Sequence, residues 1–295
     1  MKPRSADNMK VNFYDKNLLN DFYKYLSAIG LVISIVFLFV TIPNDCQFIS
    51  QDCRLITGGV LFIIIFLLFL ALWFRANKLK YLRVKIDSTS VEIKEGDLFE
   101  QEGLIAIGFN EYFDTVVDDK IISKRSLNGI FIDTHLIHTG KEVDELDVLI
   151  ESGVENEHKV KGKKRKAEGK LQRYKLGAIY LLDDRYILTA FTKFNDRNEA
   201  RLTMSEYLEF LVNFWDNVNS IYAQRSVSVP IFGGGITRFK EHKTISDEEL
   251  LKIMLWTFKI SEMRFKHPAR LTIIIHPEKI KAINLNDIKG LGNGL

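Results

Sequence analysis

The chain has 295 residues, a hydrophobic fraction of 46% and a formal net charge of +3. This length suits one or two domains, and the near-neutral balance gives no overall support for nucleic-acid binding, which draws on an excess of basic residues. The apolar residues are concentrated in two early blocks, after which the chain has the charged fraction of an ordinary soluble domain.

The two apolar blocks are long enough to cross a membrane. They run from Leu26 to Ile42 and from Leu55 to Phe74 and contain no charged residue. About 20 helical residues span a hydrocarbon core of about 30 Å, so the second block spans comfortably and the first lies at the short end of the range. A cleaved signal peptide is the alternative interpretation of the first block. A second span follows at once, however, and no small-residue cleavage site stands out between them.

Basic residues predict the orientation of these spans. They cluster before the first block and after the second, whereas the loop between the blocks, Pro43–Arg54, holds only Arg54. Because Lys and Arg resist export, the pattern predicts a multi-pass protein of the inner (plasma) membrane with both termini in the cytoplasm. The flanking basic residues are Lys2, Arg4, Lys10, Lys16 and Lys24 on one side and Arg75, Lys78, Lys80, Arg83 and Lys85 on the other.

The two cysteines of the chain, Cys46 and Cys53, both lie in the exported loop. An oxidising exterior permits a disulfide at the tip of the hairpin, and two unpaired residues in a partly buried loop are the alternative. The absence of cysteine elsewhere excludes a thiol nucleophile or a thiolate metal site in the soluble part.

The spans themselves restrict what the membrane part can do. Neither carries an ionisable residue, which argues against a carrier or a proton relay. Two helices cannot enclose a pore, so permeation requires a homo-oligomer, for which Ser27, Gly30 and Ser34 offer a small-residue stripe. A passive lipid anchor is the alternative.

The soluble part predicts an α/β sandwich. Residues 1–25 form a cytoplasmic segment, 26–85 the hairpin with a basic linker, and 86–295 the soluble domain. Alternating short strands and amphipathic helices are typical of a sheet covered on both faces. The expected strands are Val91–Ile93, Leu104–Phe109, Gly129–Asp133, Tyr174–Leu182, Tyr186–Phe191, Val227–Pro230 and Leu271–Ile275, and the expected helices His135–Ile150, Met204–Gln224 and Asp247–Phe265, the last with Ser246 and Glu249 as a capping box.

A basic run, KGKKRK, extends from Lys161 to Lys166. Charge runs usually form solvated loops, which is the first interpretation. Contact with anionic lipid or a phosphate-rich partner is the second.

Two segments carry the predicted ligand chemistry. The first, from Ile93 to Asn110, reads IKEGDLFEQEGLIAIGFN, a polar turn followed by an apolar strand that ends in asparagine. The second, from Ser226 to Phe239, reads SVSVPIFGGGITRF, a strand followed by a triple-glycine loop. Glycine turns expose backbone N–H groups that cradle phosphate, and loops at the carboxyl ends of central strands are where α/β sheets bind ligands. Alone, a glycine-rich loop is often only a tight turn.

Together, these segments resemble the macro domain, a mixed-sheet α/β/α fold that binds ADP-ribose and related nucleotides. The resemblance covers about Lys85 to Glu278. It implies that Asp97 accepts the adenine amine, that Asn110 lies near the distal ribose, and that the glycine loop holds the diphosphate through backbone N–H groups. Phe232 or Phe239 would line the pocket. The implied ligand-binding set is Asp97, Leu98, Asn110, Phe232, Gly233, Gly234, Gly235, Ile236 and Arg238.

The chain departs from hydrolytic macro domains just after Asn110. Those enzymes usually have a glycine-rich run and an acidic residue there, whereas Glu111–Phe131 contains only Gly129. Asp114, Asp118 and Asp119 could supply a carboxylate, although a surface turn also explains the adjacent pair Asp118 and Asp119. We therefore predict a binding domain with no catalytic residue, no metal and no cofactor other than the ligand.

Two spans followed by a macro-like domain resemble the membrane effectors of type II Thoeris, a bacterial anti-phage system. The resemblance implies that a TIR-domain partner makes an ADP-ribose signal from NAD, with histidine-ADP-ribose as the expected form. It further implies that ligand binding drives oligomerisation and membrane disruption. The rivals are a membrane-anchored ADP-ribosyl hydrolase and a passive scaffold.

Overall fold

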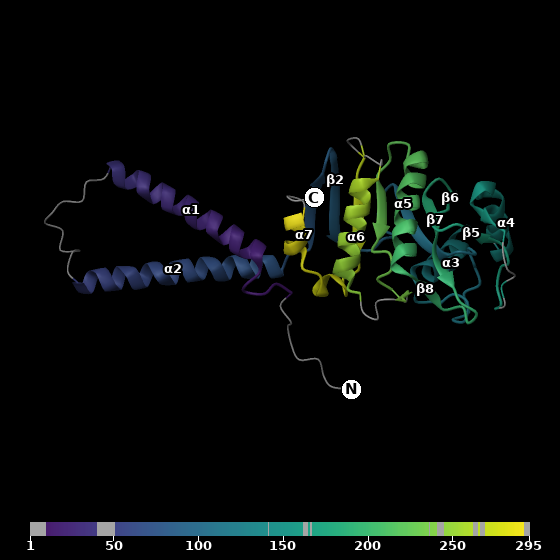
Figure 1. Ribbon diagram of the computed structural model, residues 1–295, viewed down its shortest axis with the longest axis horizontal. Helices are drawn as coiled ribbons and strands as arrows, with labels where there is room; N and C mark the ends of the chain where they lie inside the picture. The colour runs from purple at the N-terminus through teal and green to yellow at the C-terminus, as the bar shows by residue number, and fades with distance from the viewer. Residues whose placement is uncertain are drawn as a thin grey trace, which may run out of the picture. The chain divides into compact units, whose positions relative to one another are not determined.

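The computed structural model describes residues 10–39, 51–140, 142–161, 165, 167–235, 237–240, 245–261, 265 and 269–291 (Figure 1). The chain divides into two compact units. One contains residues 1–80 together with 284–294, and the other contains residues 81–283. The last helix therefore groups with the N-terminal helices although it follows the sheet in the sequence.

The first unit is built on two apolar helices, α1 (Lys16–Phe39) and α2 (Gln51–Asn77), and a short helix α7 (Leu285–Leu291). Two stretches, Lys16–Val36 and Ile56–Asn77, are long and apolar enough to span a membrane. None of the most apolar window of the first stretch is buried, and only 6% of that of the second is. A core helix of a soluble protein would instead be mostly buried.

Aromatic side chains hold α2 against the segment that precedes α1. Trp73 is 9% exposed and stacks on Phe13 with ring centroids 4.3 Å apart, while its indole N–H donates to the Val11 carbonyl at 2.8 Å. Trp73 is therefore packed inside this unit. The predicted disulfide lies outside the described residues at Cys46 and concerns an undescribed side chain at Cys53.

The second unit is a mixed sheet with the order β1–β2–β11–β9–β3–β7–β8–β10, in which β6 also pairs with β7. Strands β2, β11, β9, β3 and β7 are parallel to one another, whereas β1 and β6 run antiparallel to their partners. Strand β8 is antiparallel to β7 and parallel to β10. The bounds are β1 Tyr81–Ile86, β2 Thr89–Glu95, β3 Leu104–Asn110, β6 Ile179–Leu182, β7 Tyr186–Phe194, β8 Ala200–Leu202, β9 Val227–Pro230, β10 Arg238–Phe239 and β11 Leu271–Ile275, with a separate pair of β4 Lys159–Val160 and β5 Arg173–Tyr174.

Helices cover both faces of this sheet, which confirms the predicted α/β/α sandwich. On one face, α3 (Leu127–Thr139) and α4 (Val143–Gly153) pack on Ile105, Ile107 and Phe109 of β3. On the other face, α5 (Met204–Ile221) contributes Phe210 and Phe214 to an aromatic cluster and lies beside α6 (Asp247–Ile260) (Figure 1). Short 3-10 turns occur at Asn156–His158 and Ile280–Ala282.

Two predicted elements between residues 129 and 150 were wrong in type or extent. The expected strand Gly129–Asp133 is part of helix α3, and the expected helix His135–Ile150 is divided between α3 and α4. Ser126 explains the difference, because its hydroxyl accepts from the Gly129 N–H at 3.2 Å and starts the helix before the β-branched run. Gly140 ends it in the left-handed region at φ 63°.

The other predictions hold more closely. The capping box of Ser246 and Glu249 is present, and β9 and β11 have the predicted bounds. The expected strand Tyr174–Leu182 is divided into β5 and β6, because Gly177 turns the chain at φ 86°. Strand β1 was not predicted; it lies partly within the expected basic linker.

Candidate functional site

The predicted ligand segments meet at one edge of the sheet. Parallel strands have their carboxyl ends on the same edge, so the turns after β2, β3 and β9 all open there. The loop after β9 leads to β10, which lies beyond β3, β7 and β8 in the strand order. This loop therefore crosses the ends of β3 and β7. We call this side of the sheet the carboxyl edge.

The aspartate turn after β2 is exposed and locally ordered. Asp97 Oδ1 accepts from the Phe99 N–H at 2.8 Å, and the Gln101 side-chain amide donates to the Asp97 carbonyl at 2.6 Å. Leu98, in contrast, is 4% exposed and belongs to the core below the turn. Asp97 thus remains accessible to a ligand, whereas Leu98 supports the turn from inside.

The glycine loop requires glycine for two different reasons. Gly233 has φ 88°, and a Cβ there would lie 2.9 Å from the Phe239 ring. A Cβ on Gly234 would lie 2.5 Å from an Asp247 carboxylate oxygen, whereas one on Gly235 would meet nothing within 4 Å. The backbone of Gly235 therefore faces open space. Ile236 lies outside the described residues.

The aromatic residues next to this loop belong to the core. The Phe232 ring is 2% exposed and packs against Phe191, Phe210 and Phe214, with centroid distances of 5.4, 5.0 and 5.1 Å. Phe239 is 6% exposed and lies edge-on to Tyr207. In this structure both rings shape the loop from below, and their contact with a ligand stays a prediction.

Asn110 is buried at the end of β3 and uses its amide to shape the following turn. Its Oδ1 accepts from the backbone N–H groups of Tyr112 at 2.9 Å and Asp114 at 3.3 Å, and its Nδ2 donates to Asp114 Oδ2 at 2.9 Å. The side chain is therefore held rigidly by Asp114.

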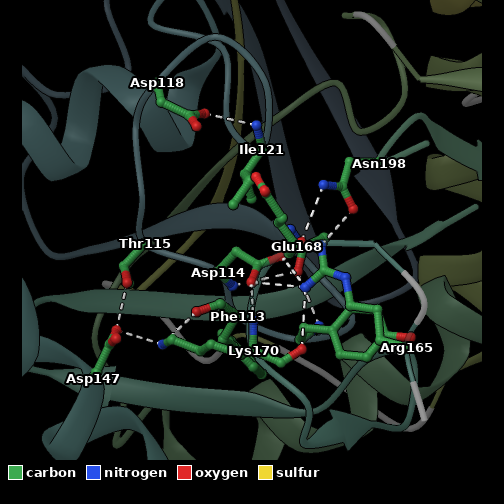
Figure 2. A network of polar contacts seen from close by, with 12 residues as sticks. Phe113, Asp114, Thr115, Asp118, Ile121, Asp147, Arg165, Glu168, Lys170 and Asn198 are labelled. Atoms are coloured by element: carbon green, nitrogen blue, oxygen red, sulfur yellow. Dashed lines mark hydrogen bonds and ion pairs between the residues drawn. The ribbon is translucent and has the colours of Figure 1, made fainter. Parts of the chain in front are cut away.

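A buried ion pair joins this turn to the basic run. Arg165 Nη1 lies 2.9 Å and 2.8 Å from the two carboxylate oxygens of Asp114, with the side chains 3% and 2% exposed (Figure 2). Nη2 donates to Asn198 Oδ1 at 2.6 Å, and the guanidinium lies 4.4 Å from the Tyr112 ring centre. Arg165 is thus inserted into the protein, which differs from the solvated loop that we expected first. Its neighbours 162–164 and 166 lie outside the described residues.

Lys170 extends the same network. Its N–H donates to Asp114 Oδ1 at 2.9 Å, and its ammonium donates to the Phe113 carbonyl at 2.7 Å and lies 2.5 Å from Asp147, which also accepts from Thr115 (Figure 2). Asp114 therefore accepts from Asn110, Arg165 and Lys170 together. A desolvated charge is stable only when it is paired and hydrogen-bonded in this way.

The other two candidate carboxylates are occupied by local turns. Asp118 Oδ1 accepts from the N–H groups of Lys120 at 2.8 Å and Ile121 at 2.7 Å. The Ile121 bond, followed by that of Lys120, holds the pKa of Asp118 below its usual value, although the slight burial opposes this. Asp119 has φ 62° and accepts from the Lys124 N–H at 2.9 Å. Oδ1 of each of these two carboxylates thus shapes the turn in which it lies.

A cavity of about 200 Å³ lies beside this network. Its wall brings two cations, Lys120 and Arg238, together with two carboxylates, Asp119 and Glu199. Asn198 and Phe194, which contact Arg165, form part of the same wall. The full lining is Asp119, Lys120, Ile121, Ser123, Phe194, Asn198, Glu199, Ala200 and Arg238.

A comparison with protein families identifies the second unit. The model described as "Thoeris protein ThsA, Macro domain" matches residues 91–276, from β2 to the end of β11. The chain belongs to the Thoeris ThsA macro-domain family. Both predicted ligand segments lie inside the matched region, and the resemblance stated from the sequence is confirmed.

Relatives of this Thoeris family member extend the match. The Thoeris protein ThsA of Bacillus amyloliquefaciens (strain Y2) is 37% identical over 262 residues, which cover 85% of this chain and 86% of the relative. The similarity therefore extends into the residues before the macro domain. Oceanobacillus iheyensis macrodomain structures, one with MES and one with ADP, each align to 73% of this chain and 98% of their own, at 13% identity and a TM-score of 0.44.

The sequence did not indicate that Arg165 and Lys279 lie near the carboxyl edge of the Thoeris macro domain. Arg165 is part of the basic run Lys161–Lys166, and charged residues in such runs normally lie on a solvated face. Lys279, after β11, contacts the Gly234 carbonyl and lies 3.3 Å from Asp247. No local pattern predicts this contact, because it depends on β11 lying next to β9.

A group of possible metal ligands lies elsewhere on the macro domain. Glu155, Glu157 and His158 place ligand atoms within 4.8 Å of one another. Both acidic residues are exposed, and exposed acidic groups commonly gather without an ion. This group does not alter the prediction of a domain without metal, which stays a prediction.

Glu111 provides a test of burial at the carboxyl edge. Burial raises the pKa of this carboxyl, and Arg173 at 3.7 Å lowers it only in part. Because the pKa of Glu111 is raised in the folded state, its carboxyl contributes fully to stability below the unfolded-state pKa of about 4.3. That contribution is lost as the pH rises through the folded-state pKa. We expect Glu111→Gln to raise the Tm at pH 7.5, with the gain shrinking towards pH 4. The exposed Glu209→Gln is the control; a Tm no higher than wild type at pH 7.5 would contradict the account.

Proposed function

We propose that this chain is a membrane effector of Thoeris anti-phage defence whose macro domain binds an ADP-ribose-type signal in the cytoplasm. In this proposal a TIR-domain partner makes the signal, histidine-ADP-ribose, from NAD. Binding drives several chains to assemble through their membrane helices, and the disrupted membrane leads to cell death or growth arrest. The observation that carries the proposal is the placement of the Asp97 turn, the glycine loop and Asn110 on one edge of a Thoeris macro domain.

The chemistry of that edge suits an anionic nucleotide. The Gly235 backbone in the glycine loop faces open space, and Lys120 and Arg238 in the wall of the neighbouring cavity add two cations. Asp97 is an exposed acceptor for an exocyclic amine. A nucleotide that extends from Asp97 across the glycine loop would end near the cavity, where a group attached to the distal ribose would lie.

The apolar helices support the membrane part of the proposal. Their most apolar windows are almost entirely exposed, and the basic residues lie on the sides that the positive-inside rule assigns to the cytoplasm. Ligand-driven assembly needs a difference in affinity between the resting and assembled states. To raise an assembled population from about 1% to 99% requires about 5.5 kcal/mol of differential binding.

The acidic residues favour binding over hydrolysis. Asp114 is neutralised by Arg165 and Lys170, and Asp118 and Asp119 are held by backbone N–H groups. A general base needs an oxygen that can accept a proton from water near the bond to be broken. The hydrolase remains the rival, and turnover of substrate would distinguish it.

Titration calorimetry with ADP-ribose, histidine-ADP-ribose and NAD tests this function. We expect stoichiometric binding of the ADP-ribose compounds, tighter for the histidine conjugate, and weaker binding of NAD. Incubation with an ADP-ribosylated protein should release no ADP-ribose. Binding should increase the oligomer size of the full chain in detergent. Absence of binding would refute the sensor, and catalytic release of ADP-ribose would favour the hydrolase.

A further inference from the structure

The cavity of about 200 Å³ lies next to the place expected for the distal ribose. Two separate connections place it there. Arg238 in its wall is the third residue after the triple-glycine loop, and three residues of chain span at most about 11 Å. On the other side, Asn198 in the wall accepts from Arg165, which is paired with Asp114 (Figure 2). Asp114 in turn holds Asn110, the residue expected near the distal ribose.

The cavity has the size of an attached group rather than of a whole nucleotide. Sites for drug-sized ligands usually have volumes of about 300–1,000 Å³, whereas this cavity has about 200 Å³. At about 30 Å³ for each water-sized group, it holds about seven such groups. It therefore suits a substituent of the ribose, while the nucleotide itself lies along the glycine loop.

The cavity wall carries two charges of each sign. Lys120 and Arg238 supply the cations, and Asp119 and Glu199 supply the carboxylates. A site for a phosphate or a second nucleotide should be cationic throughout, because neighbouring carboxylates repel an anion. A zwitterion, in contrast, needs both signs at once. The charge pattern therefore favours a ligand group that has both a carboxylate and an ammonium.

Hydrogen bonds fix the loop that carries Lys120 and Asp119. Asp118 Oδ1 accepts from the Lys120 N–H at 2.8 Å. The Asp119 N–H donates to the Ile122 carbonyl at 3.0 Å, and Asp119 Oδ1 accepts from the Lys124 N–H at 2.9 Å. A ligand in the cavity therefore loses little affinity to ordering of this loop.

Glu199 and Arg238 are fixed on the other side of the cavity. Glu199 Oε2 accepts from Asn195 Nδ2 and from Arg201 Nη2, each at 2.8 Å. The Asn195 amide, followed by Arg201, holds the pKa of Glu199 below its usual value, so the carboxylate is charged at neutral pH. Glu199 directly precedes β8, and Arg238 lies on the neighbouring strand β10, where it pairs in register with Arg201. The sheet thus sets one carboxylate and one cation beside each other.

We propose that this cavity binds the α-amino-acid group of an ADP-ribose conjugate and so distinguishes such a conjugate from ADP-ribose itself. Lys120 and Arg238 bind the α-carboxylate, and Asp119 and Glu199 bind the α-ammonium. The amino acid is joined to the ribose through its side chain, which leaves both charged groups for the protein. The glycine loop and Asp97 bind the nucleotide part. The role of the nucleotide in this inference rests on the proposed function.

A comparison of four ligands tests the site. Titration calorimetry on the full chain in detergent uses ADP-ribose and its conjugates with histidine, histamine and N-acetylhistidine. Histamine lacks the carboxylate, and N-acetylhistidine lacks the ammonium. We expect the histidine conjugate to bind about tenfold tighter than each of the other three, because each of them lacks a charged group that the cavity binds. Equal affinity for all four ligands would overturn the inference.

Two variants assign the charges. Lys120→Gln should lower the preference for the histidine conjugate over the histamine conjugate severalfold. Glu199→Gln should lower its preference over the N-acetylhistidine conjugate to a similar degree. Lys124→Gln, an exposed cation of the same loop outside the cavity lining, is the control and should keep both preferences. Preferences that stay unchanged in Lys120→Gln and Glu199→Gln would show that the four charges only neutralise one another.

A second arm needs no nucleotide and separates this site from the proposed function. Ile121 and Ala200 line the cavity, so their methyl signals in nuclear magnetic resonance report on its contents. In the full chain in lipid nanodiscs, we expect millimolar L-histidine to shift both signals, and histamine to shift neither. If the signals move while calorimetry detects no ADP-ribose compound, only the proposed function fails. Signals that do not move, together with no preference among the conjugates, overturn the amino-acid site whether or not ADP-ribose binds.

Discussion

Replacing Asp114 with alanine is expected to lower the free energy of unfolding of the macro domain by about 3–5 kcal/mol. The substitution leaves the Arg165 guanidinium buried without its carboxylate, and it also removes the acceptor for Asn110 Nδ2 and Lys170 N–H. For a domain of this size, the loss corresponds to a fall in Tm of about 6–20 °C. Thermal unfolding followed by circular dichroism measures it.

The burial of the pair, rather than the loss of a charge, is the cause of this effect. The control is Arg197→Ala, which removes an exposed partner of Glu199 at 3.5 Å and should change stability by no more than about 0.5 kcal/mol. The apolar double variant Asp114→Leu with Arg165→Met should recover most of the loss, because it leaves no unpaired charge. An Asp114→Ala protein as stable as the wild type would show that the pair is not buried in solution.

Gly235→Val is expected to weaken ADP-ribose binding by at least about 100-fold, which is about 2.7 kcal/mol, without destabilising the fold. A Cβ at this position has no heavy atom within 4 Å beyond its chain neighbours, so the structure has room for a side chain there. In the proposed complex the same space holds the diphosphate, and hydrogen bonds to a charged group contribute about 1.5–3 kcal/mol each. Calorimetry measures the affinity and thermal unfolding measures the stability.

Comparison with the other glycines sharpens this prediction. Gly234→Val would also meet Asp247 and should lower both affinity and Tm. Ser152→Val on the exposed face of α4 should alter neither. Wild-type affinity in the Gly235→Val protein would place the diphosphate away from the glycine loop and would remove the main support for the proposed binding mode.

The sheet could be predicted from sequence because its strands carry local signals. Val227–Pro230 and Leu271–Ile275 are short runs rich in Val and Ile, typical of strands in a mostly buried sheet, and both appear with those bounds. Helix α3 could not be predicted in the same way. Its run of Ile130, Phe131 and Ile132 favours a strand locally, and the Ser126 cap together with packing on β3 overrides that preference.

The candidate site likewise contains some residues that the sequence could predict and others that it could not. The Asp97 turn, Asn110 and the glycine loop each have a sequence signal, and they lie at the carboxyl edge of the sheet, as strand direction requires. Arg165 and Lys279 could not be predicted, because their roles come from contacts between segments that are distant in the chain.

The most direct test of the account is dye leakage from liposomes that contain the purified full-length chain. Histidine-ADP-ribose, added on the side of the macro domain, should trigger leakage in the wild type within the concentration range in which calorimetry detects binding. Liposomes that contain the Gly235→Val protein should not leak under the same conditions. Leakage that begins before ligand is added, or a bound wild type that never leaks, would contradict the claim that nucleotide binding at the carboxyl edge controls the membrane helices.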